Sequence, residues 1–167
     1  MNIVLTGMSG AGKSTLGVLA AKALGMNFTD TDILIQEKEH ALLQDILDDR
    51  GIEYFMHAEE SVLCGLNADD TVIATGGSAV YYEKAMKHLS QNACVIYLAM
   101  PYEEIEKRVK NITTRGIVMK KGNSLRDVFN EREPLYRAYS DHVIDCTGCE
   151  IEQCVEMIVK MAEKDII

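Results

Sequence analysis

The chain has 167 residues, of which 47% are hydrophobic and 26% charged, the balance of an ordinary globular protein forming one domain over residues 1–167. Its formal net charge of −9 would repel nucleic acid and anionic membrane surfaces, so we expect neither as a partner. No stretch approaches 18 consecutive apolar residues and the N-terminus lacks a secretory pattern, so we expect a cytoplasmic protein. We also expect a monomer rather than an oligomer.

Short apolar runs alternate along the chain with longer amphipathic stretches. The runs, which predict strands, lie at 3–5, 27–29, 72–74, 94–98 and 143–144. The amphipathic stretches, which predict helices, lie at 16–24, 33–49, 53–66, 82–89, 102–110, 125–139 and 151–162. Such alternation implies right-handed crossovers and a parallel sheet covered on both faces. We therefore expect a three-layer α/β fold with about five parallel strands and ligands at their carboxyl ends.

Residues 7–14 read G-M-S-G-A-G-K-S, a complete G-x-x-x-x-G-K-[ST] phosphate-loop pattern placed between the first predicted strand and the first predicted helix. In such a loop, backbone N–H groups and the positive end of the helix dipole face a bound phosphate chain. Lys13 adds a charge that reaches the outer phosphates, and Ser14 a hydroxyl for Mg²⁺. We expect ATP and Mg²⁺, the nucleotide being held by Gly10, Ala11, Gly12, Lys13, Ser14 and Thr15.

Two segments interrupt the alternation. Residues 33–66 contain two helical patterns with no strand between them, so we expect a small substrate-binding lobe there. Residues 111–123 have no clear periodicity and are basic and glycine-containing, as in a lid over phosphates, although an idle surface loop is the alternative. Cys146 and Cys149 form a C-x-x-C, for which we prefer reduced thiols to a metal or redox pair.

The remaining motifs separate the classes of phosphate-loop protein. The chain has no Asn-Lys-x-Asp element for guanine, and the strand at 72–74 runs into Thr75-Gly76-Gly77-Ser78 rather than ending in an Asp for Mg²⁺. The run ending in Asp145 comes late and is interpreted as an edge strand and turn. These features leave a small kinase that phosphorylates a metabolite.

At this point the chain resembles the shikimate kinase family over nearly its whole length. The matching segments are GMSGAGKSTLG (7–17), FTDTD (28–32), ATGGSAV (74–80), TRGIV (114–118) and EREPLY (131–136). The resemblance implies a phosphate-loop kinase fold and transfer of phosphate from ATP to a hydroxyl of shikimate. Two alternatives remain open: a kinase of the same fold for another hydroxylated metabolite or a nucleoside monophosphate, and an ATP-binding regulatory module with little turnover.

Asp30 and Asp32 follow the second predicted strand, with side chains on the same side if the strand persists. One carboxylate could hold Mg²⁺ through its waters and the other accept the proton of the substrate hydroxyl, although a solvated acidic turn would look similar. The resemblance assigns Asp30 to the metal and Asp32 to the hydroxyl. Gly76 and Gly77 leave their backbone N–H groups accessible to substrate or phosphate.

Arg132 lies on the apolar face of the helix predicted at 125–139, a pattern that Pro134 interrupts soon afterwards. An inward arginine needs an anion, which is either a structural ion pair or a substrate carboxylate. The resemblance favours the substrate. It also implies that Arg115 contacts phosphate from the lid and that Arg108 packs on adenine.

One position departs from the family pattern. Where these kinases normally carry an arginine that helps Arg132 to clamp the substrate carboxylate, this chain has Met56, while the arginine's partner Glu59 is retained. Losing one member of a buried charge pair costs about 2–5 kcal/mol, or roughly thirty- to several-thousand-fold in affinity. Either shikimate binds weakly, or another cation replaces the arginine, or the pocket is adapted to a different hydroxyl compound.

Overall fold

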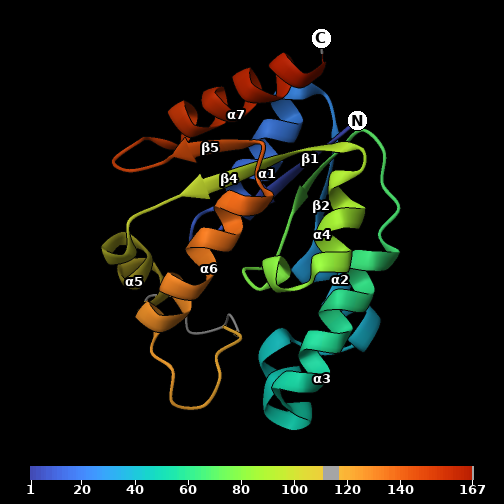
Figure 1. Ribbon diagram of the computed structural model, residues 1–167. Helices are drawn as coiled ribbons and strands as arrows, with labels where there is room; N and C mark the ends of the chain where they lie inside the picture. The colour runs from blue at the N-terminus through green and yellow to red at the C-terminus, as the bar shows by residue number, and fades with distance from the viewer. Residues whose placement is uncertain (111–116, 167) are drawn as a thin grey trace.

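The computed structural model describes residues 1–110 and 117–166, which form a five-stranded parallel sheet with helices on both faces (Figure 1). The strand order is β2-β3-β1-β4-β5, and every neighbouring pair is parallel. The strands are β1 (Asn2–Thr6), β2 (Asn27–Asp30), β3 (Thr71–Ala74), β4 (Ala93–Ala99) and β5 (His142–Asp145). The helices are α1 (Lys13–Leu24), α2 (Thr31–Glu39), α3 (Leu43–Gly65), α4 (Glu83–Ser90), α5 (Tyr102–Lys110), α6 (Leu125–Tyr139) and α7 (Ile151–Ile166), with a short 3₁₀ helix, η1 (Ala79–Tyr81). The predicted fold class is confirmed.

The sheet is the centre of the main core. Helices α1 and α7 pack together on one face, and α4 and α6 contact β4 from the other (Figure 1). Because both faces of the sheet are covered, the middle of its central strand is apolar: Ile3, Val4 and Leu5 in β1 are fully buried. β5, which ends in Asp145, is an edge strand as predicted. Within the described residues, no helix is both long and apolar enough to cross a bilayer.

The segment predicted as a substrate lobe contains a second, smaller core. Ile35, Leu43, Ile46 and Phe55 from α2 and α3 pack together with Val118, which precedes α6. In Figure 1 these two helices lie beyond the carboxyl ends of the strands, opposite the segment that leads into α6. The lobe is therefore placed to cover one side of a site at that edge of the sheet.

Two helix ends are fixed by local chemistry. Gly25 ends α1 in the left-handed region with φ 70°, and Ser124 and Asp127 form the reciprocal capping box that starts α6. The single helix predicted at 33–49 is wrong, because the chain leaves α2 at His40, with φ 52°, and begins α3 at Leu43. A second non-helical residue, Gly51 with φ 81°, kinks α3 close to the predicted break.

Two element ends near the site, which the sequence pattern gave only conditionally, are fixed by side-chain contacts. β2 ends at Asp30 instead of persisting to Asp32, because the Asp30 side chain caps α2 by accepting the Asp32 backbone N–H at 3.0 Å. Pro134 lies inside α6, which ends at Tyr139 as predicted. The last turn of α6 is fixed by Tyr136, which is fully buried and donates its hydroxyl to the Gly77 carbonyl at 2.5 Å.

We expect Gly17→Ala to destabilise the fold by about 1–3 kcal/mol, the usual cost of overpacking a core. Gly17 is a buried residue of α1, and a Cβ there would lie 2.7 Å from the Phe28 ring and 3.3 Å from Leu5 Cδ1. Gly65→Ala is the matched control, because its Cβ would meet nothing within 4 Å. Urea unfolding measures both, and equal stability of the two variants would contradict the packing of α1 on the sheet.

Candidate active site

The phosphate loop connects β1 to α1 and is shaped by glycines. Gly10 and Gly12 have φ values of 89° and 91°, a left-handed conformation that glycine adopts without strain. Lys13, the first residue of α1, is 7% exposed, and its Nζ donates to the carbonyls of Gly7 at 2.7 Å and Met8 at 2.8 Å. The ammonium group is therefore held inside the curve of the loop, where a phosphate chain would lie.

Ser14 and Asp30 are brought together beside this loop. The Ser14 hydroxyl donates to Asp30 Oδ2 at 2.5 Å, while Asp30 Oδ1 caps α2. A hydroxyl and a carboxylate in contact are the hard oxygen donors that Mg²⁺ takes, and this ion usually binds to one or two carboxylates plus substrate phosphates. The described residues include no cluster of three or more His, Cys, Asp or Glu arranged for a metal. The Ser14–Asp30 pair thus fits a magnesium ion shared with a nucleotide.

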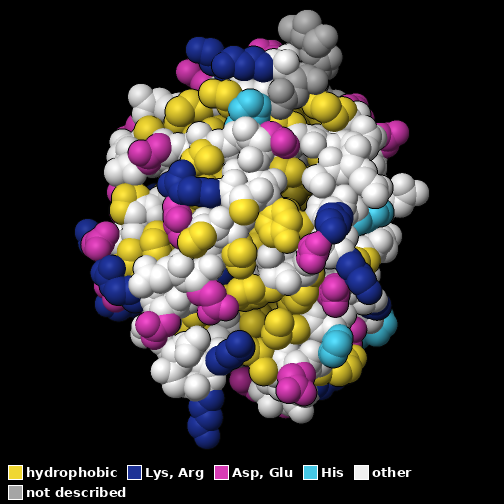
Figure 2. Space-filling view, in the orientation of Figure 1, with side chains coloured by type: hydrophobic (Ala, Val, Ile, Leu, Met, Phe, Trp, Pro, Cys, Tyr) yellow, Lys and Arg dark blue, Asp and Glu magenta, His cyan; other side chains and the backbone are white. Residues whose placement is uncertain are grey.

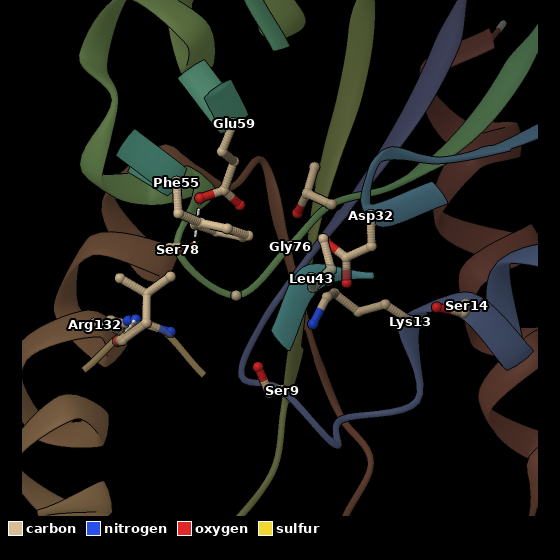
Figure 3. Close-up of a pocket in the computed structure, with 13 residues that line it drawn as sticks. Ser9, Lys13, Ser14, Asp32, Leu43, Phe55, Glu59, Gly76, Ser78 and Arg132 are labelled. Carbon is tan, nitrogen blue, oxygen red and sulfur yellow. Dashed lines mark hydrogen bonds between the residues drawn. The ribbon is translucent and has the colours of Figure 1, made fainter. Parts of the chain in front are cut away.

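A cavity lies next to the loop at the carboxyl ends of the strands (Figure 3). It receives side chains from α1, α2, α3, the segment after β3, and α6. Its lining residues are Ser9, Lys13, Ser14, Asp32, Leu43, Phe55, Glu59, Thr75, Gly76, Gly77, Ser78, Val118 and Arg132. We call it the acceptor cavity. Lys13, Asp32, Gly76, Gly77 and Arg132, which the sequence predicted as site residues, therefore share one space.

Gly76 and Gly77 lie where a larger side chain would collide with neighbouring atoms. A Cβ at Gly76 would lie 2.4 Å from Glu59 Oε1 and 2.9 Å from Asp32 Oδ1. A Cβ at Gly77 would lie 3.0 Å from Ser9 Oγ and 3.1 Å from Arg132 Nη1. The expectation that the Gly76 backbone N–H is accessible to a ligand is wrong, because it donates to the Thr31 hydroxyl at 3.1 Å.

Arg132 is 1% exposed in α6 and points into the cavity (Figure 3). Its Nη2 donates to the Val118 carbonyl at 2.6 Å, and its Nε to the Tyr81 hydroxyl at 3.2 Å. Its guanidinium lies 5.0 Å from the centre of the Tyr81 ring. The structural ion pair that the sequence left open is not formed with any described residue. A buried cation held by neutral groups is suited to an anionic ligand.

Glu59 contributes a buried carboxylate to this site, and it is 1% exposed. Its Oε2 accepts hydrogen bonds from Ser78 Oγ at 2.6 Å and from Tyr82 OH at 2.7 Å. Burial raises the pKa of Glu59 to about 7, against the opposing effect of these two donors. The sequence indicated Glu59 as a retained partner but gave no sign of Ser78 and Tyr82, because contacts from another segment leave no periodic pattern.

Met56 does not line the acceptor cavity. It lines a neighbouring, mostly apolar chamber together with Ile52, Tyr81, Val118, Lys120, Asn123, Val128 and Glu131. On the face shown in Figure 2, apolar side chains gather between the α2–α3 lobe and the segment before α6, whereas acidic and basic side chains are interspersed around them. The position where the family pattern has an arginine therefore contributes an apolar surface.

Arg108 lies on the other side of the phosphate loop. Its Nη1 donates to the Gly10 carbonyl at 3.3 Å, and its Nη2 is 3.6 Å from Glu104. It lines a second cavity with the loop residues Ala11, Gly12 and Thr15 and with Leu16, Met100, Cys146, Cys149, Ile151 and Cys154. The sequence did not indicate that three thiols border this space. Burial raises the pKa of Cys146 to about 12, so this thiol stays protonated.

The remaining predicted site residue, Arg115, lies outside the described residues, as do positions 111–116 of the predicted lid. Of the later lid residues, Val118 is buried in the small core of the lobe. Its carbonyl accepts from Arg132, so this part of the chain connects the lobe to α6.

The parallel sheet, the glycine-rich loop and the adjoining cavity define a phosphate-loop kinase fold. The shikimate kinase family model matches residues 9–163, and the chain belongs to the shikimate kinase family. It is 35% identical over 153 residues to a shikimate kinase of Bacillus anthracis, covering 91% of this chain and 92% of that protein. It is 33% identical over 162 residues to one of Caldanaerobacter subterraneus subsp. tengcongensis, covering 95% and 94%. The structure of shikimate kinase from Acinetobacter baumannii in complex with shikimate matches with a TM-score of 0.90 at 30% identity, covering 98% of this chain and 93% of that one.

Proposed function

We propose that this chain transfers the γ-phosphoryl group of ATP to a hydroxyl of shikimate. The observation that carries the proposal is that Lys13, Asp32 and Arg132 line one cavity beside the phosphate loop. These residues supply the three requirements of such a reaction: a cation for the phosphates, a proton acceptor for the hydroxyl, and a buried cation for the acid group of the acceptor.

In this proposal, the P–O bond to the β-phosphate breaks as the acceptor oxygen bonds to the γ-phosphorus, and Asp32 takes the hydroxyl proton. Lys13 offsets the charge that develops on the phosphoryl oxygens. Arg132 holds the acceptor carboxylate, and Arg115 is assigned to the phosphates. Ser14 and Asp30 would hold Mg²⁺, which neutralises phosphate charge when bound. The base of ATP is assigned to the cavity beside Arg108.

A second acceptor class is favoured by Met56. Met56 borders an apolar chamber and brings no positive charge. Among the described residues, Arg132 is therefore the one buried arginine that could hold an acid group of the acceptor. A less acidic hydroxyl compound would lose less from the missing charge. The test is ADP release with shikimate, other hydroxy acids, polyols and nucleoside monophosphates at matched concentrations. We expect shikimate to give the highest kcat/KM, and a neutral polyol that exceeds it would replace shikimate as the acceptor.

We expect Met56→Arg to lower the KM for shikimate about tenfold or more with little change in kcat, because it adds a cation three residues before Glu59 on the same helix face. The matched control is Met119→Arg, which adds the same charge at an exposed methionine. Steady-state kinetics with saturating ATP measures both. An unchanged KM in Met56→Arg would show that position 56 does not act on the acceptor.

A further inference from the structure

The carboxyl of Glu59 has an asymmetric environment. Two donors, the hydroxyls of Ser78 and Tyr82, bond to the same oxygen, Oε2. The other oxygen, Oε1, faces Gly76 inside the acceptor cavity, as Figure 3 shows. Hydroxyl donors on Oε2 favour the ionised carboxyl but are also compatible with the neutral one, since a proton on Oε1 leaves both bonds in place. Glu59 can therefore change its charge without rearrangement of its neighbours.

The charged groups around Glu59 come from each element that packs against it. Asp32 of α2 faces the same Gly76 from the other side, and Arg132 of α6 and Lys13 of α1 line the same cavity. Tyr82 and Ser78 contribute hydroxyls from the segment after β3. With Glu59 ionised, the two carboxylates balance the two cations. With Glu59 neutral, the cavity carries a net positive charge and favours an anion.

We propose that Glu59 is the specificity-determining positioning residue of the acceptor cavity: held by the hydroxyls of Ser78 and Tyr82, it takes up a proton when an anionic acceptor binds and releases it when the anion leaves. This rests on the proposed function, because shikimate is the anionic acceptor used to test it. The proton comes from solvent, so charge and atoms balance. In this chain, proton uptake at Glu59 takes the place of a second cation at position 56.

The direction of the pH effect follows from the environment of the carboxyl. Burial, and to a lesser degree Asp32, raises the pKa of Glu59 to about 7, while Ser78, Tyr82 and Arg132 oppose the rise. Below this pH Glu59 is neutral and the acid binds well. As pH rises through about 7, Glu59 ionises and repels the acceptor carboxylate. Shikimate affinity therefore falls with rising pH, and binding above pH 7 draws a proton from solvent.

The decisive experiment is calorimetric titration of shikimate into the nucleotide-free protein in two buffers of different ionisation enthalpy, repeated from pH 6 to 8.5. The wild type takes up a substantial fraction of a proton near pH 7.5, and its affinity falls about tenfold over this range if the coupling is one pKa unit. Glu59→Gln keeps an acceptor for Ser78 and Tyr82 but takes up no proton, and its affinity is nearly independent of pH. Shikimate methyl ester, which lacks the charge, induces no uptake.

Two further variants separate titration from a merely structural role. Ser78→Ala removes a donor that favours the ionised form, so it moves the midpoint of the affinity change to higher pH. His57→Gln removes another titratable side chain from the exposed surface of α3 and leaves proton uptake unchanged. Uptake in Glu59→Gln equal to that of the wild type, or none in the wild type, would overturn the proposal.

Failure of the proposed function is a separate result, in which shikimate neither binds nor is phosphorylated at any pH. The Glu59 proposal is then decided by the unfolding of the ligand-free protein. A raised pKa in the folded state means that this group's contribution to stability is lost as pH rises from about 5 towards 7.5. Glu59→Gln shows a shallower loss over that range, and equal slopes in the two proteins overturn the proposal.

Discussion

Replacing Asp32 with Asn is expected to lower kcat with shikimate by about 10²–10⁴-fold, the usual contribution of a positioned proton acceptor. Asparagine has nearly the same shape as aspartate, and its backbone N–H still donates to the Asp30 carboxylate. The cap of α2 and the Ser14–Asp30 pair therefore stay intact. The Asp32 carboxylate lines the acceptor cavity with Lys13, so its removal affects the chemical step. The loss is therefore expected in kcat, with ATP affinity within about threefold of the wild type.

Single-turnover phosphorylation and nucleotide binding measure these two effects separately. Asp45→Asn is the matched control, because it removes the same charge from an exposed position of α3 in the same lobe. If Asp32→Asn keeps kcat within threefold of the wild type, Asp32 is not the proton acceptor. A loss of ATP affinity as large as the loss of kcat would instead place Asp32 in nucleotide binding.

Most of the fold could be predicted from the sequence because its signals are local. Five apolar runs separated by amphipathic stretches define a covered parallel sheet, and Gly25 and Ser124 mark helix ends through their own chemistry. The break at His40 could not be predicted, because no glycine or proline marks it. It is explained by tertiary packing, in which Ile35 of α2 and Leu43 of α3 share the small core of the lobe. Helix α6 was predicted to Tyr139 and ends there, with Pro134 inside it.

The candidate site likewise contains residues that the sequence predicts and contacts between them that it does not. The phosphate loop, Asp32 and the two glycines follow from short motifs, and Arg132 from the periodicity of its helix. The partners that give these residues their properties could not be predicted. Arg132 bonds to Val118 and Tyr81, which lie 14 and 51 residues away in the chain. The role of Ser78 is apparent only from the structure, in which its hydroxyl donates to Glu59.

Replacing Arg132 with Met is expected to raise the KM for shikimate by about thirty- to several-thousand-fold, which corresponds to about 2–5 kcal/mol for removing one partner of a buried charged contact. The effect on folding should be much smaller. The guanidinium is 1% exposed and forms no ion pair with the described residues, so the folded protein bears the cost of burying a charge that few groups offset. Methionine relieves that cost, although it leaves the Val118 carbonyl and the Tyr81 hydroxyl without this donor.

The two effects are measured by steady-state kinetics with shikimate and with ATP as the varied substrate, and by the Tm of the ligand-free protein. Arg137→Met is the matched control, because Arg137 lies five residues later in α6, with an exposed side chain that pairs with Glu133. A large rise in the shikimate KM with a small change in Tm and an unchanged ATP KM assigns Arg132 to the acceptor. Unfolding of Arg132→Met with little change in acceptor affinity would show that the arginine is retained for stability, because its partners then outweigh the cost of burying its charge.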